Sequence, residues 1–459
     1  MHDDQPLDPG AEKVHRAACE GCAESRLLMS RRSMLGVTAG LFSWAFMPRF
    51  AEAASAGHDP RLLVVVLRGG MDGISTVVPF GDPHYVSMRG GIAIPAASTI
   101  KLNSFFGLHP ALASFGNFYK AKQAAVVHAT CVPLHSRSHF DGQDNLENGL
   151  PGLAANSTGW LNRLLTALPA GAPIKSKGAI QIGDAPLILR GPAPVLGWSP
   201  TWFTHVEDPT LYLVRTLYRE NDPQLLSVLD RGLRADRLAE RNTADDGNIS
   251  SLRKGFRGAA RLVGASDGPR IAVLSVGGWD THSDQGGTTG QLAEDIRELD
   301  RGLQDFKTTI GSAWSQTVVL CVTEFGRTVH VNGDSGTDHG VGTVALLAGG
   351  AVNGGKVFGD WPGLAPAKLY EGSDLTPTTD IRSIFKGVLR DHLGVPLTLL
   401  NSSIFPQSQS APPMPNLVKS GTTAAMAESL AEYSPAPLRE EPPIARYRRG
   451  QRVTRERAS

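Results

Sequence analysis

Short apolar runs separated by longer amphipathic stretches dominate the chain between about residues 57 and 408. Five runs are predominantly apolar and rich in β-branched residues, at residues 62–67, 124–129, 271–276, 318–322 and 343–347. Such runs are typical of strands that are buried on both faces of a sheet. The first run ends at Arg68-Gly69-Gly70, and we expect it to form the central strand.

Helical patterns lie between and around these runs. They occupy residues 111–122, 140–148, 160–168, 211–241, 290–307 and 380–393. Alternating strands and helices favour a parallel sheet covered on both faces. We therefore predict an α/β fold, a three-layer α/β/α sandwich with a mostly parallel central sheet. The charged stretch 211–258 is predicted to be a helical insertion that caps the site or contacts a partner, or simply a solvated helical pair.

The two ends of the chain differ from this body. Residues 1–56 contain Ser30-Arg31-Arg32-Ser33, an apolar run at 34–47 and small residues up to Ala56. This pattern predicts a cleaved twin-arginine signal peptide and a periplasmic or secreted protein, with translation starting at Met1 or at Met29. The apolar run is shorter than the ~20 residues that span a bilayer, so we expect no stable membrane span after cleavage. Residues 409–459, rich in Pro, Ser and Ala with a basic end, are predicted to form a flexible tail.

The composition excludes two broad classes of protein. The formal net charge is +1 and 41% of the residues are hydrophobic. A nucleic-acid-binding protein would carry a basic excess, and a disordered chain would be less hydrophobic, so we expect no nucleic-acid partner and a globular body.

Four clusters of polar residues that could form a functional site follow the predicted strands or lie close to them. They occupy residues 69–73, 136–141, 277–282 and 336–340. The carboxyl ends of parallel strands face one crevice, so these clusters can meet in space. Asp280 and His282 project to the same side of an extended segment, and Asp338-His339 lie in a glycine-rich loop. Asp72 follows two glycines and is either a ligand or the residue that closes an Asx turn. Mixed carboxylates and imidazoles suit one or two divalent ions, zinc or manganese rather than calcium.

Glu324 and Arg327 lie at the end of another predicted strand. Glu324 is a candidate metal ligand or general base, and Arg327 a candidate for holding an anionic group. The alternative is a structural ion pair between the two side chains.

The segment 135–141 joins the second predicted strand to a helix. The Ser138-x-x-Asp141 spacing resembles a capping box, so Ser138 is predicted to cap the helix. A hydroxyl at a helix N-terminus also suits a nucleophile, and we prefer Ser138 to Ser136 for that role. The remaining candidates for substrate or metal contacts in this segment are His135, Arg137 and His139.

Together these motifs resemble the DUF1501 family of exported bacterial proteins, which is grouped with the alkaline phosphatase and sulfatase superfamily. The resemblance runs from about residue 62 to 394, within a predicted alkaline-phosphatase-like domain at 57–408. It implies a metal-bound Asp after the first strand, a Ser or Thr nucleophile at a helix start and two further Asp/His groups. The positions that fit these implied roles are Asp72, Ser138, Asp280, His282, Asp338 and His339. The sequence departs from the superfamily at Asp280-x-His282, where the usual spacing is longer, and at Glu324-Phe325, where Asp-His is usual.

The function expected from these residues and this resemblance is an exported metal-dependent hydrolase of phosphate or sulfate esters, with a small anionic ester as substrate. The alternative is a non-catalytic exported binding or assembly protein that keeps the fold. The resemblance implies a DUF1800-type exported protein as its partner, because the two families are often encoded side by side.

Overall fold

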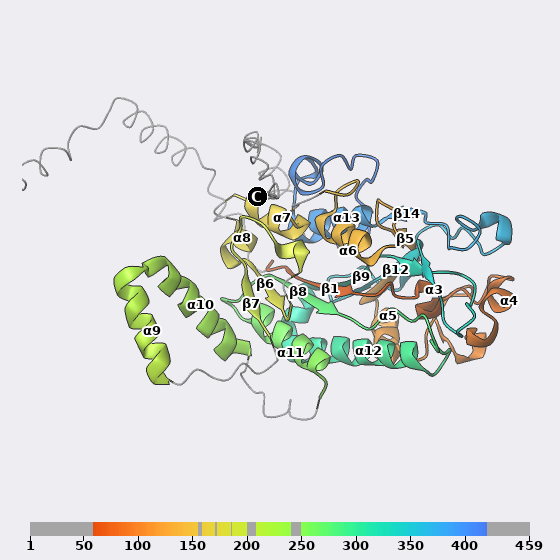
Figure 1. Cartoon of the computed structure of the whole chain (residues 1–459), viewed down its shortest axis with the longest axis horizontal. Helices are drawn as coiled ribbons and strands as arrows, with labels where there is room; N and C mark the ends of the chain where they lie inside the picture. The colour runs from red at the N-terminus through yellow and green to blue at the C-terminus, as the bar shows by residue number, and fades with distance from the viewer. Residues whose placement is uncertain are drawn as a thin grey trace, which may run out of the picture. The chain divides into compact units, whose positions relative to one another are not determined.

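A nine-stranded mixed sheet forms the centre of the protein (Figure 1). The computed structural model describes residues 58–154, 158–169, 172–184, 186–199, 208–239 and 249–419. The predicted signal peptide therefore lies outside the described residues. The strands are β1 (Arg61–Leu67), β5 (Ala124–Cys131), β6 (Ala179–Ile182), β7 (Leu196–Trp198), β8 (Ile271–Val276), β9 (Thr317–Thr323), β12 (Thr343–Ala348), β13 (Lys356–Phe358) and β14 (Thr379–Asp380).

The strand order confirms the mostly parallel sheet, with the first strand at its centre. The order is β13-β5-β12-β9-β1-β8-β6-β7, and β14 also pairs with β5. β1 runs parallel to both β8 and β9, whereas β12 runs antiparallel to both β5 and β9. The reversal of β12 was not predicted. Because of it, the start of β12 lies at the same edge of the sheet as the carboxyl ends of its neighbours.

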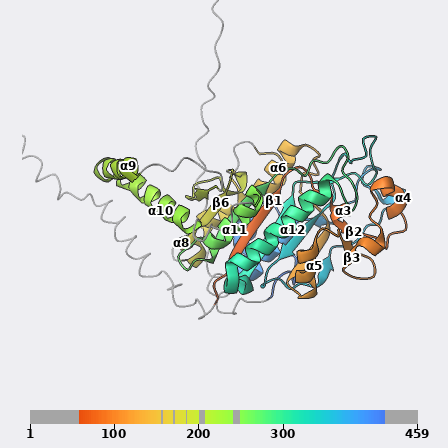
Figure 2. The ribbon, with the colours of Figure 1, turned by 90° about the horizontal axis from the view of Figure 1, so that it is seen from below.

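Helices cover both faces of the sheet, which confirms the three-layer sandwich (Figures 1 and 2). One face carries α6 (His139–Asn148), α7 (Trp160–Ala167) and α13 (Ile381–Leu393), and the other carries α5 (Ala113–Lys120), α11 (Ser251–Gly264) and α12 (Gln291–Ile310). Side chains alternate along β1, so that Leu62 packs in the first core and Leu63 in the second.

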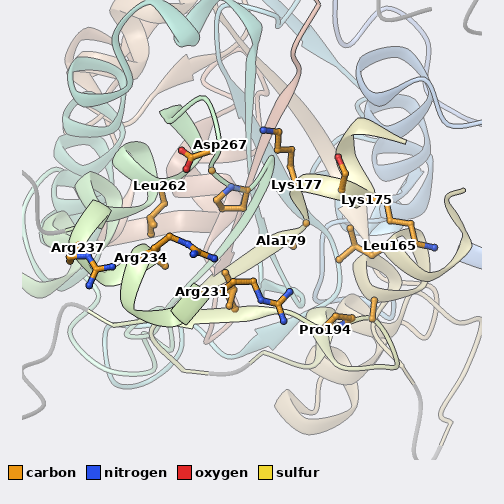
Figure 3. Close-up of a pocket in the computed structure, with 17 residues that line it drawn as sticks. Leu165, Lys175, Lys177, Ala179, Pro194, Arg231, Arg234, Arg237, Leu262 and Asp267 are labelled. Carbon is orange, nitrogen blue, oxygen red and sulfur yellow. The ribbon is translucent and has the colours of Figure 1, made fainter. Parts of the chain in front are cut away.

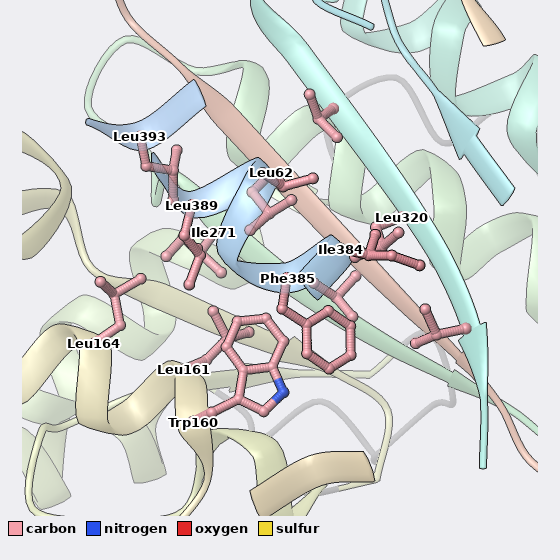
Figure 4. Packing of buried hydrophobic residues seen from close by; sticks show 14 of the residues in the cluster. Leu62, Trp160, Leu161, Leu164, Ile271, Leu320, Ile384, Phe385, Leu389 and Leu393 are labelled. Carbon is pink, nitrogen blue, oxygen red and sulfur yellow. The ribbon is translucent and has the colours of Figure 1, made fainter. Parts of the chain in front are cut away.

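The first core is anchored by aromatic side chains from two helices. The rings of Trp160 in α7 and Phe385 in α13 stack with their centroids 4.7 Å apart, next to Leu62 and Leu320 of the sheet (Figure 4). Trp160 and Phe385 are almost completely buried. Stacked aromatic rings contribute about 0.5–1.5 kcal/mol beyond the area that they bury, so this pair fixes α13 against α7.

The predicted helical insertion is smaller than expected. The pattern at 211–241 forms two helices, α9 (Asp208–Asn221) and α10 (Pro223–Ala239). Proline at the start of α10 cannot donate the hydrogen bond that would continue α9, and Asp222 accepts hydrogen bonds from the amides of Gln224 and Leu225 instead. α11 overlaps the predicted insertion, but Phe256 on it is completely buried, so α11 belongs to the covering layer.

The folded domain extends beyond the predicted boundary at residue 408. Leu417 and Val418 are buried in the first core, and Val418 forms a β-bridge with Val352. Residues 409–419 therefore pack on the domain, which corrects the start of the predicted tail, and the rest of that tail lies outside the described residues.

Shorter elements complete the described fold. They are α3 (Gly73–Thr76), α4 (Tyr85–Arg89), α8 (Pro173–Lys177), α14 (Leu397–Leu399), β2 (Val77–Val78), β3 (Ile100–Lys101), β4 (Gly107–Leu108), β10 (Gly326–Arg327) and β11 (His339–Gly340). Among the helices of the described residues, none has the length and apolar character needed to cross a membrane.

Candidate metal centre

Loops from distant parts of the chain meet at the carboxyl edge of the sheet. His139 begins α6, in the connection that follows β5, and Asp280 and His282 follow β8. His339 lies in β11, shortly before the reversed strand β12. Gly69, at φ +125°, allows the loop after β1 to pass closely, because a Cβ there would lie 2.5 Å from the Asp280 amide nitrogen. The sheet topology thus assembles these side chains.

Three of these side chains form a group that could hold a metal ion, and His282 adjoins it. His139 Nε2 lies 3.3 Å from Asp280 Oδ2, and His339 Nε2 lies 3.2 Å from Asp280 Oδ1. One donor atom from each of these three residues lies within 4.8 Å of the other two. His282 Nε2 lies 3.1 Å from Asp280 Oδ1 and 3.0 Å from His339 Nε2. Ligand atoms at about 2.0 Å around a tetrahedral ion lie roughly 3.3 Å apart, so the spacing suits a small divalent ion.

The second ring nitrogen of each histidine is held by an oxygen atom. His139 Nδ1 lies 2.9 Å from Glu324 Oε1, and His339 Nδ1 lies 2.7 Å from the carbonyl oxygen of Arg137. His282 Nδ1 lies 3.2 Å from Asp338 Oδ1. Donation from Nδ1 leaves Nε2 without a proton and free to bind an ion, the arrangement found around histidine ligands in metalloproteins.

One ligand atom lacks a hydrogen-bond partner. Nε2 of His139 is buried and makes no hydrogen bond within the described structure, although a carboxylate oxygen of Asp280 lies close to it. A buried polar atom without a partner is rare and calls for an explanation, such as an ion that the atom would bind. The donor set therefore fits a divalent cation by both distance and chemistry.

Arg327 stabilises the negative charge of the central carboxylate. Burial alone would raise the pKa of Asp280, but the hydrogen bond and the positive charge of Arg327 outweigh burial and hold the pKa below its usual value. Nη1 of Arg327 lies 2.7 Å from Asp280 Oδ1, and Arg327 also contacts Thr337 and the Gly69 carbonyl. Arg327 is buried and engaged, so we assign it to positioning Asp280, which differs from the predicted contact with an anionic group.

Glu324 holds the ring of His139 through a hydrogen bond. Its carboxylate is completely buried and accepts hydrogen bonds from His139, the Gly69 amide and Gln143. Burial would raise the pKa of Glu324, but these hydrogen bonds hold it below its usual value. Reciprocally, the hydrogen bond to Glu324 is the main reason why the pKa of His139 is raised. Glu324 therefore acts through His139, and the predicted ion pair with Arg327 does not form.

Asp72 is the main correction to the predicted ligand set. Its side chain is completely buried and forms an ion pair with Arg89. Oδ1 caps α3 by accepting hydrogen bonds from the amides of Ile74 and Ser75, and Oδ2 accepts one from Gln285 at 2.7 Å. These contacts saturate the carboxylate, and Asp72 takes the turn-closing role that the sequence had left open.

The serines of segment 135–141 organise the start of α6. Ser138 is the N-cap residue, and its Oγ accepts a hydrogen bond from the Asp141 amide at 3.4 Å. Ser136 Oγ accepts one from the Ser138 amide at 3.0 Å. Asp141 contributes its backbone to this cap. The capping prediction for Ser138 is confirmed, and its role as a nucleophile stays a prediction.

Two other predicted contact residues point to partners outside the cluster. The guanidinium of Arg137 pairs with Glu371 and Asp374, each at 2.6 Å. His135 Nε2 lies 3.3 Å from Cys131 Sγ, and its ring packs edge-on against Tyr370. Arg137 therefore reaches the centre only through its carbonyl oxygen, and His135 contributes no described contact to it.

Two supporting residues were not singled out in the sequence. Gln143 donates to Glu324 at 3.0 Å, and Asn332 donates to Asp338 at 3.1 Å. Gln143 lies four residues after His139 and so on the same side of α6, a spacing that could have identified it. Asn332 lies in a loop, and no local pattern marks it.

The centre is open to solvent. The side chains of Asp280 and His282 are 43% and 42% exposed, whereas that of His139 is 27% exposed. Next to His139, Phe140 is 87% exposed. A catalytic metal site keeps such access for a substrate, whereas a structural site is closed.

Solved structures with some likeness to this chain include several enzymes. The C-terminal periplasmic domain of EcEptC from Escherichia coli, solved in complex with zinc, is 9% identical over 64% of this chain and 74% of that chain, with a TM-score of 0.34. The phosphonate monoester hydrolase of Agrobacterium radiobacter is 13% identical over 73% of this chain and 74% of that chain, with a TM-score of 0.32. A protein in the alkaline phosphatase superfamily from Vibrio parahaemolyticus is 12% identical over 64% of this chain and 61% of that chain, with a TM-score of 0.26.

These likenesses are distant, so the site rests on its own geometry. No curated protein matches the sequence. The family model described as a protein of unknown function, DUF1501, matches residues 59–396, and the chain belongs to that family.

Proposed function

We propose that this protein is an exported metal-dependent hydrolase of phosphate or sulfate esters. One observation carries the proposal: imidazoles from three separate segments of the chain direct Nε2 toward the solvent-exposed carboxylate of Asp280. Each imidazole is held from behind by an oxygen atom. Supporting contacts of this kind orient ligands in metalloenzymes.

His139, Asp280 and His339 would hold the ion, and His282 offers a fourth donor. Nitrogen and carboxylate donors suit zinc or manganese. Such an ion, when bound, supplies Lewis-acid activation of a water molecule and of an ester oxygen near neutral pH.

The chain's own residues prepare this site in three ways. Arg327 stabilises the negative charge of Asp280, Glu324 fixes the ring of His139, and Asp338 fixes the ring of His282. Because Arg137 and Arg327 are engaged within the chain, neither is free to bind the substrate. Recognition of a small anionic ester therefore depends on the positive charge of the ion at the solvent-exposed centre.

Metal analysis combined with a panel of aryl phosphates and aryl sulfates tests the proposal. The purified mature protein should contain zinc or manganese and hydrolyse at least one ester. Asp280→Ala should lose the ion and at least about a hundred-fold of the activity, because a central donor is gone. Asp334→Ala, which removes an exposed carboxylate from a nearby loop, should change neither. A protein without bound metal and without turnover would refute the proposal.

A non-catalytic assembly role is the second candidate, and one observation favours it. Large apolar side chains are exposed on α9 and α10, namely Tyr212, Leu213, Leu217, Leu225 and Val228. Exposed apolar patches mark protein contacts. Two results together would support this role. The protein would form a stoichiometric complex with a DUF1800-type exported protein that is lost in the double variant Leu213→Asp/Leu217→Asp, and it would hydrolyse none of the esters in the panel.

A further inference from the structure

A cavity lies near the amino ends of the strands, at the opposite end of the sheet from the metal centre. It has a volume of about 1080 Å³ and opens beside α8 and α10 (Figure 3). Its wall includes Lys177, just before β6, and residues 267–269, just before β8. The metal centre follows the carboxyl end of β8, whereas this cavity borders the amino ends of β6 and β8. The two sites are therefore separate.

The polar part of the cavity wall is strongly cationic. Its charged side chains are Lys175, Lys177, Arg231, Arg234, Arg237 and Asp267. Five cations face one carboxylate, so the wall carries four net positive charges. A wall of this kind attracts anions.

Three arginines supply most of this charge and remain available. Arg231, Arg234 and Arg237 are spaced three residues apart on α10, which places them on one side of the helix. All three are exposed, and none forms an ion pair with another residue that the structure describes. Arg231 and Arg234 extend from α10 toward the strand that carries Ala179 (Figure 3). By contrast, Lys175 and Lys177 donate to backbone carbonyls.

The rest of the wall is apolar. Its apolar residues include Leu165, Ala179, Pro194, Leu196, Ala235 and Leu262. Ala179 and Leu262 are buried and belong to the two cores, so this surface is part of the rigid domain. An apolar surface next to several cations suits a ligand with one apolar and one anionic part. The volume is that of a small-molecule site.

We propose that this cavity binds a small anionic amphiphile, with its phosphate, phosphonate or sulfate head on Arg231 and Arg234 and its apolar body against Pro194 and Leu196. Arginine suits this head group because its planar fork donates two hydrogen bonds to an oxyanion. The proposal does not depend on hydrolysis at the metal centre.

Calorimetry with octylphosphonate, used below its micelle-forming concentration, tests the proposal. Its carbon–phosphorus bond is not an ester, so turnover does not complicate the measurement. Octylphosphonate should bind saturably to the mature protein, and a saturable site should remain in Asp280→Asn, in which the metal centre is disrupted, because the cavity lies elsewhere. Arg234→Gln should weaken binding about ten-fold, the loss expected for one charge-assisted hydrogen bond. Arg234→Lys should restore part of it.

Matched probes and a matched variant separate this site from general charge attraction. Arg219→Gln removes the same charge from α9, outside the cavity, and should leave binding unchanged. Methylphosphonate should bind at least about ten-fold more weakly than octylphosphonate because it lacks the apolar body. Equal binding by the two phosphonates, equal loss in Arg219→Gln and Arg234→Gln, or no binding of octylphosphonate by folded protein would each overturn the proposal.

Discussion

Arg89 determines what Asp72 does. Both side chains are completely buried, and Gln285 adds a further hydrogen bond to the same carboxylate. A buried carboxylate without its cation would be left charged in a medium that solvates it poorly. At the scale of the residue, the partner therefore decides between a ligand and a structural group.

Removing one member of this pair should destabilise the protein without affecting its metal content. Asp72→Ala leaves Arg89 buried without its partner, so the free energy of unfolding should fall by about 3–5 kcal/mol in urea. Metal bound per chain should stay at the wild-type level. The double variant Asp72→Ala/Arg89→Met should recover part of the stability. A loss of metal in folded Asp72→Ala would restore Asp72 to the ligand set.

The first turn of α6 holds both the residue that caps the helix and a candidate metal ligand. Ser138 caps the helix, and the next residue, His139, faces the metal centre. A cap of this kind fixes the direction in which the first helical side chain leaves the backbone. At the scale of the element, the cap therefore positions a candidate ligand.

Replacement of Ser138 separates a cap from a nucleophile. Ser138→Ala should lower the free energy of unfolding by about 1 kcal/mol, the usual cost of a lost N-cap, and Ser138→Asp should restore it. If Ser138 only caps the helix, the rate of ester hydrolysis should change by less than about three-fold in both variants. Hydrolysis that falls more than about a hundred-fold in both variants, at unchanged metal content, would identify Ser138 as the nucleophile.

The central elements could be predicted because they bury continuous apolar runs. The five predicted strands correspond to β1, β5, β8, β9 and β12 within a few residues. The short strands β6, β7 and β13 carry too few apolar residues to stand out. The reversal of β12 was missed because its own sequence contains nothing that specifies direction, which depends on the loop before it.

The residue types of the site could be predicted from the sequence, but the contacts between those residues could not. The sequence singled out Asp280, His282, Asp338 and His339 as ligands because polar residues in glycine-rich segments cluster near strand ends. The structure brings Asp280, His282 and His339 together, whereas Asp338 lies behind His282 and contacts its ring. Asp72 carries a similar local pattern. Its partner Arg89 reaches it only through the packing of α4, which no local pattern encodes.

Two buried histidines make the stability of the whole molecule depend on pH. Burial lowers the pKa of His128 and of His392 to about 4, and each ring hydrogen-bonds to a backbone carbonyl. Between about pH 6.5 and 4 the unfolded chain binds more protons than the folded chain. Their contribution to stability is therefore complete above pH 6.5 and is lost as the pH falls toward 4.

Unfolding in urea at two pH values measures this effect. At pH 5, His128 should account for about 2 kcal/mol of the loss in stability relative to pH 7.5. His128→Gln should show a correspondingly smaller loss over the same interval. His330→Gln changes an exposed histidine and should retain the wild-type difference. Identical losses in all three proteins would show that His128 does not cause the pH dependence.

The reversed strand β12 also affects how the chain is held together. Its direction returns His339 to the edge where His139 and Asp280 arrive from β5 and β8. An ion shared by these residues would cross-link three segments that lie far apart in the sequence. No fragment cut between Asp280 and His339 holds the complete set of donors. Retention of the ion would therefore report that β5, β8 and β12 have assembled into the sheet.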